Sequence, residues 1–379
     1  MTKKENILKA LAHKKVDRIP WTMYQSFPPW GSTELNYRNS GLSMIYQHFP
    51  ACTVYMPDVE VAEENKFTLD KDGRGRQVIL RKFKTPVGEI SAKHEFFNSN
   101  LPGPGDLIQK FGSDIDAEIL SWVTEFPFKS EKDYKVLEFI YSNMEFRPTN
   151  KGYLFTENMI GEEGVIFVSV GRTPFQMLLY ELMGPNNCFI EYTSNPEKFN
   201  RLYDLLYERQ REKYKIASKN PGKIIWSPDN ITGSMTPPKF FEKYVLPFYN
   251  EMADILHAED KYFGVHMDGL LDPIKDLIGK TKLDIIEAFT PPPMGDLSVA
   301  EALKLWPEKV VWVNFPASVI AAGDRSVSEK YTIDLLKSVA PGDRVLIGCT
   351  ENYPLDKWEI GYGGVKDALD KYGDYPVDI

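Results

Sequence analysis

The chain has 379 residues, enough for one large domain or two ordinary ones, and with 42% hydrophobic and 26% charged residues it has a soluble globular composition. A net charge of -9 argues against nucleic acid as the main partner. No apolar run approaches the roughly 20 residues of a membrane-spanning helix. The N-terminal residues lead into an amphipathic helix and do not have the apolar core of a signal peptide. We therefore expect a cytoplasmic protein with no membrane contact.

The first part of the chain mixes one clear helix with short strands. Residues 3–13 have apolar residues at helical spacing, and they precede a strand at 19–24. Residues 25–40 are rich in Pro, Gly, Ser and aromatic residues, which is typical of a loop. The next elements predicted are a helix over 43–49 and a second strand over 53–56.

Residues 60–100 depart from this alternation of strands and helices. Short runs there alternate apolar with charged residues, and the turn-forming sequence at 71–75 separates two of them. This pattern predicts an antiparallel β meander inserted after strand two, at about 60–100.

From residue 165 the alternation of strand and helix is regular. The pattern predicts six further strands, at 165–170, 223–226, 262–265, 284–289, 310–315 and 345–349. With the first two they make eight, which predicts an α/β fold of the (β/α)₈ TIM-barrel type, in a single domain over 1–379. The alternative, a doubly wound open sheet, normally has a Gly-rich turn after strand one, and the sequence has none there.

Several side chains able to bind a metal follow the ends of the predicted strands. His266 and Asp268 are two residues apart at the end of strand five, so they point to the same side of an extended segment. Glu287 lies on strand six and Cys349 ends strand eight, and strand ends share one mouth of a barrel. One His, one Cys and two carboxylates are enough for a zinc site. Alternatively, His266 and Asp268 form a polar pair, Asp268 only orients His266, and Cys349 is a core residue.

Other residues near the predicted mouth are candidates for a substrate pocket. Asp229 and Asn230 follow strand four, although both residue types also favour turns and helix caps. Arg172 follows strand three and is equally compatible with a surface ion pair. Tyr24 and Trp30 follow strand one, where they can form an aromatic wall or serve packing alone.

At these residues the chain resembles the uroporphyrinogen decarboxylase superfamily, in its branch of zinc-dependent, corrinoid-linked methyltransferases. The resemblance covers nearly the whole chain. The residues that carry it are Asp17-Arg18-Ile19-Pro20, Tyr244-Val245-Leu246-Pro247, Gly264-Val265-His266-Met267-Asp268-Gly269, the segment from Glu287 to Asp296, and Gly348-Cys349.

The resemblance implies zinc held at His266 and Cys349, with Glu287 at the place of a further glutamate ligand. Asp268 departs from the family, which has Cys there. A carboxylate makes zinc a harder and stronger Lewis acid, better suited to an ether or phenol oxygen than to a thiol. The resemblance, together with this departure, therefore implies methyl transfer from a methoxylated small molecule, such as a methoxyarene, to Co(I) of a corrinoid (cobalamin). Asp229 or Tyr24 would protonate the leaving oxygen.

The corrinoid is expected on a separate corrinoid protein, because the predicted barrel and insertion use the length of the chain. Two alternatives remain, a methylcorrinoid:thiol methyltransferase and a decarboxylase. For the decarboxylase, Asp58 lies near the family's aspartate after strand two, but residues 22–30 lack the arginines that bind polycarboxylates. Barrel proteins often form homodimers, and the sequence decides neither for nor against one.

Overall fold

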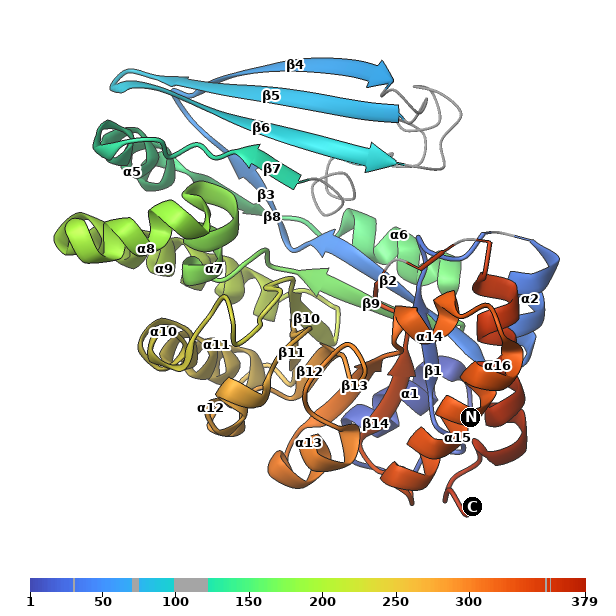
Figure 1. The fold of residues 1–379 in the computed structure, drawn as a ribbon. Coiled ribbons are helices and arrows are strands. Elements are labelled where there is room, and N and C mark those ends of the chain that lie inside the picture. The colour runs from blue at the N-terminus through green and yellow to red at the C-terminus, as the bar shows by residue number, and fades with distance from the viewer. Residues whose placement is uncertain (30, 70–74, 99–121, 352, 355) are drawn as a thin grey trace. The chain divides into compact units, whose positions relative to one another are not determined.

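Eight parallel strands close into a barrel in the computed structural model, which describes all residues except 30, 70–74, 99–121, 352 and 355. The strands follow one another around the barrel in chain order, and the last pairs with the first (Figure 1). They are β1 (Trp21–Tyr24), β2 (Leu42–Pro50), β9 (Gly164–Ser169), β10 (Ile224–Ser227), β11 (Tyr262–His266), β12 (Ile285–Phe289), β13 (Val310–Asn314) and β14 (Val345–Gly348). The predicted (β/α)₈ barrel is confirmed.

The chain divides into two compact units. The first comprises Met1–Ala51, Thr149–Gly171 and Tyr214–Ile379, and it contains the barrel. The second comprises Cys52–Pro148 and Arg172–Lys213. The prediction of a single domain over 1–379 stays a prediction.

The helices of the first unit lie outside the barrel strands, as the pairs around β11 to β14 show in Figure 1. They are α1 (Lys3–Leu11), α2 (Ser32–Asn39), α6 (Lys151–Ile160), α10 (Pro238–Phe240), the π-helical η3 (Phe241–Val245), α11 (Leu246–His257), η4 (Asp272–Ile274), α12 (Lys275–Gly279), α13 (Val299–Leu305), α14 (Ala317–Ala321), α15 (Arg325–Val339) and α16 (Trp358–Tyr372). Helix α9 (Pro196–Ser218) runs from the second unit into the first.

The second barrel strand is not where the sequence analysis placed it. The helix predicted over 43–49 is wrong, because Leu42–Pro50 is a strand whose residues 42–45 are buried between β1 and β9. A short apolar run of this kind does not distinguish a strand from a buried helix by its periodicity. The strand predicted at 53–56 is β3 (Cys52–Tyr55), which pairs outside the barrel. The expected loop over 25–40 contains α2.

The second unit contains the antiparallel insertion predicted after strand two, and its described strands extend beyond 60–100. A four-stranded sheet has the order β4 (Glu60–Leu69), β5 (Gly75–Thr85), β6 (Gly88–Asn98) and β7 (Trp122–Glu125), and β3 pairs with β8 (Glu145–Pro148). The helices are η1 (Glu131–Asp133), α5 (Tyr134–Asn143), α7 (Pro174–Met177), the π-helical η2 (Leu178–Leu182) and α8 (Gly184–Ser194).

Aromatic side chains fill the inside of the barrel. The ring of Phe167 lies 5.8 Å from Trp226 and 5.3 Å from Trp312, measured between ring centroids. Ile7 and Leu11 of α1 belong to the same buried cluster. The indole nitrogen of Trp312 donates to Thr22 Oγ1 at 2.8 Å. The interior is therefore a packed core, as expected for this fold, and leaves only the two ends of the barrel for chemistry.

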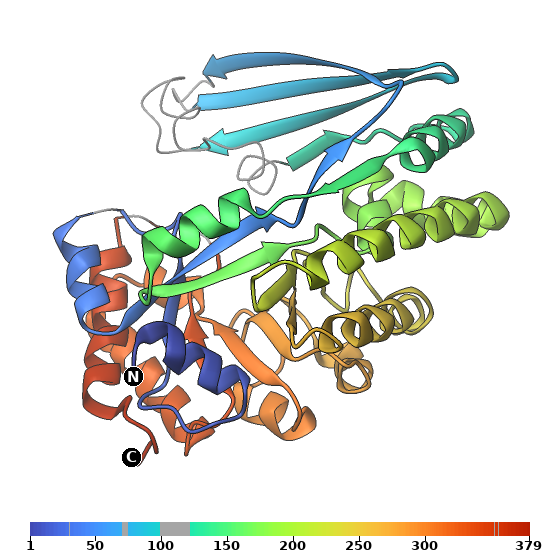
Figure 2. The same cartoon turned by 180° about the vertical axis from the view of Figure 1, so that it is seen from behind.

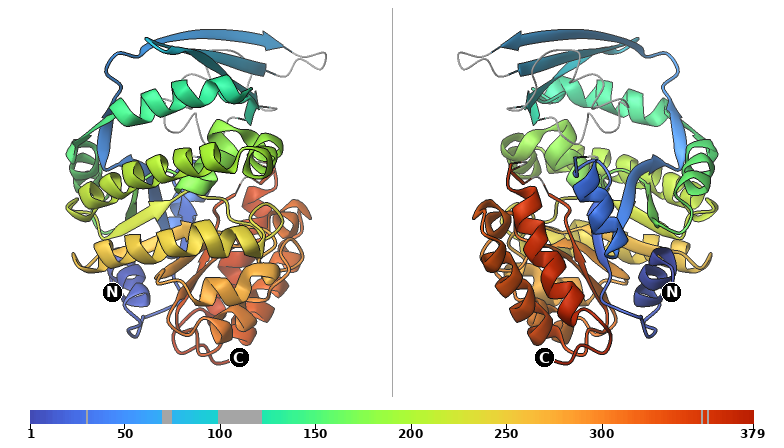
Figure 3. Two further views of the ribbon diagram at one scale, coloured as in Figure 1. Left: turned by 90° about the vertical axis from the view of Figure 1, so that its left-hand side faces the viewer. Right: turned by 90° about the vertical axis from the view of Figure 1, so that its right-hand side faces the viewer.

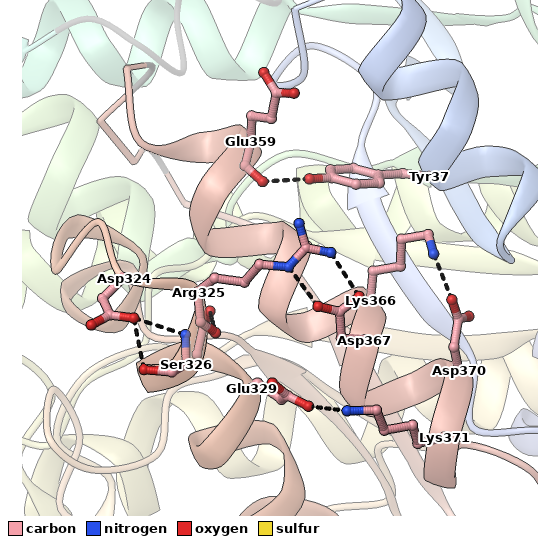
Figure 4. A network of polar contacts seen from close by, with 11 residues as sticks. Tyr37, Asp324, Arg325, Ser326, Glu329, Glu359, Lys366, Asp367, Asp370 and Lys371 are labelled. Carbon is pink, nitrogen blue, oxygen red and sulfur yellow. Dashed lines mark hydrogen bonds and ion pairs between the residues drawn. The ribbon is translucent and has the colours of Figure 1, made fainter.

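Helices α15 and α16 lie side by side on the barrel (Figure 3). A Cβ atom at Gly364 would lie 2.2 Å from the carbonyl oxygen of Arg325, so only glycine allows this close approach. Ion pairs join the two helices at their surface, with the Arg325 guanidinium donating to Asp367 at 2.5 and 2.7 Å and Lys371 to Glu329 at 2.5 Å (Figure 4). Within the described ranges, no helix combines the length and the apolar composition that a membrane crossing requires.

A buried lysine at the N-terminal end of β13 gives the barrel a pH-dependent stability. Lys309 is 3% exposed, and its ammonium group donates to the carbonyl oxygens of Thr281 and Leu283 at 2.6 and 3.1 Å. Burial lowers the pKa of Lys309 to about 8. Between pH 8 and 10.5 the folded state therefore loses this proton before the unfolded state does, and stability rises with pH.

We predict that Lys309→Met abolishes this rise. The free energy of unfolding of the wild type, relative to the variant, should increase by up to about 3 kcal/mol between pH 7 and 10. Urea unfolding at several pH values measures the difference. The variant lacks the amine at every pH, so the lost hydrogen bonds lower its free energy of unfolding by the same amount at each pH. Parallel curves of unfolding free energy against pH for the wild type and the variant would contradict the prediction.

Candidate active site

The C-terminal ends of the barrel strands bring most of the predicted metal-binding residues to one mouth. His266 ends β11 and is paired in register with Glu287 of β12. Cys349 directly follows β14, and Asn314 ends β13 in register with Gly348. A Cβ atom at Gly348 would lie 2.9 Å from the carbonyl oxygen of Val313, so glycine here allows the tight approach of the two strands before Cys349.

Glu287 is the centre of a buried hydrogen-bond network. Its side chain is inaccessible to solvent. Tyr24 donates its hydroxyl to Oε1 at 2.7 Å, and Trp226 donates its indole N–H to Oε2 at 2.9 Å. His266 Nδ1 lies 2.8 Å from Oε2. A buried carboxylate is tolerated only when it is paired and hydrogen-bonded, and these donors satisfy both oxygens.

The backbone next to Glu287 is strained. Ala288 has φ +58°, a left-handed conformation that is uncommon for residues other than glycine. The register between β12 and β13 shifts between Ile286 and Phe289, which marks a β-bulge at this position. Bulges re-aim side chains and are frequent next to active sites. The bulge therefore accompanies the turn of Glu287 into the barrel interior.

Glu287 also sets the protonation of its neighbours. Burial alone lowers the pKa of His266, but the charge of Glu287 and their hydrogen bond outweigh burial and raise the pKa to about 9. Asp268 and Glu351 contribute in the same direction. Burial, followed by the charge of Glu287, holds the pKa of Tyr24 well above its usual value. The raised pKa of His266 favours a protonated ring that donates from Nδ1 to Glu287.

Cys349 is buried at the same mouth. It is 1% exposed, and its thiol lies 3.6 Å from the carbonyl oxygen of Glu351. Burial raises the pKa of Cys349 to about 12, and a hydrogen bond with the hydroxyl of Tyr362 opposes this rise. The group is a neutral thiol at pH 7 unless a cation stabilises the thiolate.

Two further carboxylates belong to this electrostatic cluster. Asp268 is half-buried on the loop after β11 and is close enough to raise the pKa of His266. Glu351, two residues after Cys349, is half-buried, and burial followed by the charge of Asp268 raises its pKa. The sequence analysis did not single out Glu351. Its one signal was the spacing from Cys349 beyond the end of strand eight.

The predicted acid Asp229 lies after β10 and is completely buried. It accepts hydrogen bonds from the Ser227 hydroxyl at 3.0 Å and from the Tyr249 hydroxyl at 2.6 Å. Asn230 is exposed and has φ +52°, a conformation that suits asparagine in a turn. These contacts favour structural roles, and the predicted catalytic and substrate-binding roles stay predictions.

The remaining predicted substrate residues do not lie in the described part of the barrel unit. Arg172 belongs to the second unit, where it lies 3.4 Å from Glu181. Asp58 belongs to the same unit, is exposed, and borders a hollow lined also by Glu60 and Lys84. Trp30 is outside the described residues. Their roles in binding substrate stay predictions.

The donors at the mouth fit zinc in kind. Zinc takes imidazole, thiolate and carboxylate ligands, and a ligand His is normally held through its other nitrogen by a carboxylate. Glu287 holds His266 in this way and leaves Nε2 for another partner. With both oxygens engaged, Glu287 is placed to orient a ligand. In the described ranges, however, no three His, Cys, Asp or Glu side chains are gathered to share one ion, so the ligand set stays a prediction.

No protein-family model matches the chain, and no curated protein does. Among solved structures the chain is similar to a methyltransferase from Methanosarcina mazei, with 12% identity, a TM-score of 0.54, and coverage of 97% of this chain and 99% of that one. At this identity the likeness shows the fold. An L-Ala-D/L-Glu epimerase matches at 9% identity over 82% of this chain and 94% of that one, but its TM-score of 0.18 carries no argument.

We predict that Glu287→Leu destabilises the folded protein by about 3–5 kcal/mol, because it leaves three buried donors without an acceptor. Tyr24→Phe removes only one donor and should cost about 1 kcal/mol. Because the two residues share a hydrogen bond, the double variant should be more stable than the sum of the single effects implies. Urea unfolding with a chelator present measures all three. Additive effects would contradict the network.

Proposed function

We propose that this protein is a zinc-dependent methyltransferase that moves a methyl group from a methoxylated small molecule to the corrinoid of a separate corrinoid protein. The observation that carries the proposal is the pairing of His266 with buried Glu287 at the barrel mouth that also presents Cys349. The likeness in fold to the methyltransferase from Methanosarcina mazei supports the same class of reaction.

In this proposal His266 and Cys349 hold zinc, together with a carboxylate from Asp268 or Glu351. Bound zinc would supply Lewis acidity toward the oxygen that loses the methyl group. The carboxylate in place of a second thiolate favours an oxygen substrate over a thiol. Glu287 orients the imidazole of His266, and Tyr362 hydrogen-bonds Cys349 in its buried position.

The leaving oxygen needs a proton, and the two predicted acids are both engaged. Tyr24 directs its proton to Glu287, and the charge of that carboxylate opposes ionisation of the phenol. Asp229 accepts hydrogen bonds from the hydroxyls of Ser227 and Tyr249. These contacts support a role for both residues in holding neighbouring groups. Proton donation by either one stays part of the proposal.

Metal analysis tests the site independently of activity. We expect about one zinc per chain in the purified protein and its loss in both His266→Ala and Cys349→Ala. X-ray absorption should show a single sulfur ligand, and Asp268→Cys should add a second if Asp268 is a ligand. His257→Ala is the matched control, because His257 pairs with Asp284 in a separate ion pair 2.9 Å long. Wild-type protein that binds no zinc after reconstitution would overturn the metal site.

Methyl transfer tests the reaction. With a methoxyarene and a Co(I) corrinoid protein, we expect methylation of the corrinoid and release of one phenol for each methyl group transferred. The absorbance of the corrinoid measures its methylation. Both products should require the zinc-loaded chain and should fall at least about 100-fold in His266→Ala, since a lost metal removes the stabilisation of the departing oxygen. Transfer only to or from thiols, with zinc bound, would contradict the oxygen substrate and leave the metal site standing.

A further inference from the structure

Helix α6 carries a contiguous apolar patch on its outward face. Leu154, Phe155 and Met159 are 47%, 70% and 62% exposed. Phe155 and Met159 are four positions apart, so their side chains are neighbours on the helix surface. Leu154 directly precedes Phe155 and extends the exposed apolar surface at one side of this pair. Single exposed apolar residues need no explanation, but a neighbouring pair as exposed as Phe155 and Met159, flanked by Leu154, is characteristic of an interaction surface.

The helix that carries this patch is firmly attached to the barrel. Tyr153, Thr156 and Ile160 form its buried face, and the helix lies along β9 (Figure 2). Lys4 of α1 lies 3.2 Å from Glu157, and the Asn150 side chain before the helix accepts from Asn220 at 2.9 Å. The outward face is therefore presented in a fixed orientation, which lowers the entropic cost of binding a partner there.

The two ends of α6 carry opposite charges. Lys151 begins the helix, is exposed, and has no ion-pair partner among the described side chains. Glu162 follows Gly161, which ends the helix with φ +54°, and it is exposed with only the Thr2 hydroxyl as its hydrogen-bond donor, at 2.7 Å. The patch thus lies between a lysine and a glutamate, neither of which has an ion-pair partner among the described residues.

We propose that this face binds a second copy of the same chain, so that two α6 helices pack antiparallel across a two-fold axis near Phe155 and Met159. A two-fold axis places the same surface on both sides of an interface, so a patch is buried only if it is self-complementary. Antiparallel packing meets this condition here, because it brings Lys151 of each copy to Glu162 of the other while the apolar side chains pack in the centre. It also opposes the two helix dipoles.

Sedimentation velocity and light scattering over a range of concentrations test the proposal. The wild type should be a dimer, and Phe155→Glu should raise its dissociation constant at least about 100-fold, because a charge then replaces the central apolar anchor. Ile190→Glu is the control, since Ile190 is 56% exposed on α8 of the second unit and should leave the dimer unchanged. Circular dichroism and thermal unfolding verify that both variants fold.

Charge exchange provides the second test. Lys151→Glu and Glu162→Lys should each raise the dissociation constant by about three- to tenfold, and the double variant should restore it because the pair is re-formed with exchanged signs. A monomeric wild type at tens of micromolar, a dimer that persists in Phe155→Glu, or a double variant weaker than both single variants would each overturn the proposal.

Discussion

A single buried carboxylate constrains the mouth of this barrel. Glu287 has no access to water, so its charge must be compensated by donors from the protein itself. Those donors are Tyr24, Trp226 and His266, which come from β1, β10 and β11. The carboxylate on β12 therefore ties together the ends of four strands, from opposite sides of the barrel interior. Removing one donor side chain leaves part of the buried carboxylate without a hydrogen bond and weakens the remaining contacts, which makes the network cooperative.

The network also decides which groups remain available for chemistry. Tyr24 and Trp226 donate their polar hydrogens to Glu287, and Nδ1 of His266 is hydrogen-bonded to the same carboxylate. Nε2 of His266 is left for another partner, in a mouth that also contains Asp268 and Glu351. One imidazole thus lies near several carboxylates, and this is the setting in which the proposed zinc would bind.

Much of the barrel was predictable because periodicity is a local property of the chain. The strands that end in His266 and Cys349, and the strand that carries Glu287, were found from buried runs between helices, and their common mouth follows from parallel topology. The strand Leu42–Pro50 was missed because its local sequence pattern does not distinguish it from a helix. It is a strand because it pairs with β1 and β9. The convergence of Tyr24 and Trp226 on Glu287 was not predictable for the same reason, since it joins residues more than 60 positions apart.

Two sets of contacts hold the predicted ligands of the mouth. On one side Glu287 fixes His266, and on the other Tyr362 and the backbone of Glu351 contact Cys349. The carboxylates between them, Asp268 and Glu351, follow the strand ends on loops. Moving a group that is held by buried hydrogen bonds costs free energy, because those bonds must break. A carboxylate on a loop moves at a lower cost. The donors suit zinc in kind, although the described side chains are not gathered around one point. In the proposed site, Asp268 or Glu351 on its loop would therefore have to move toward His266 and Cys349.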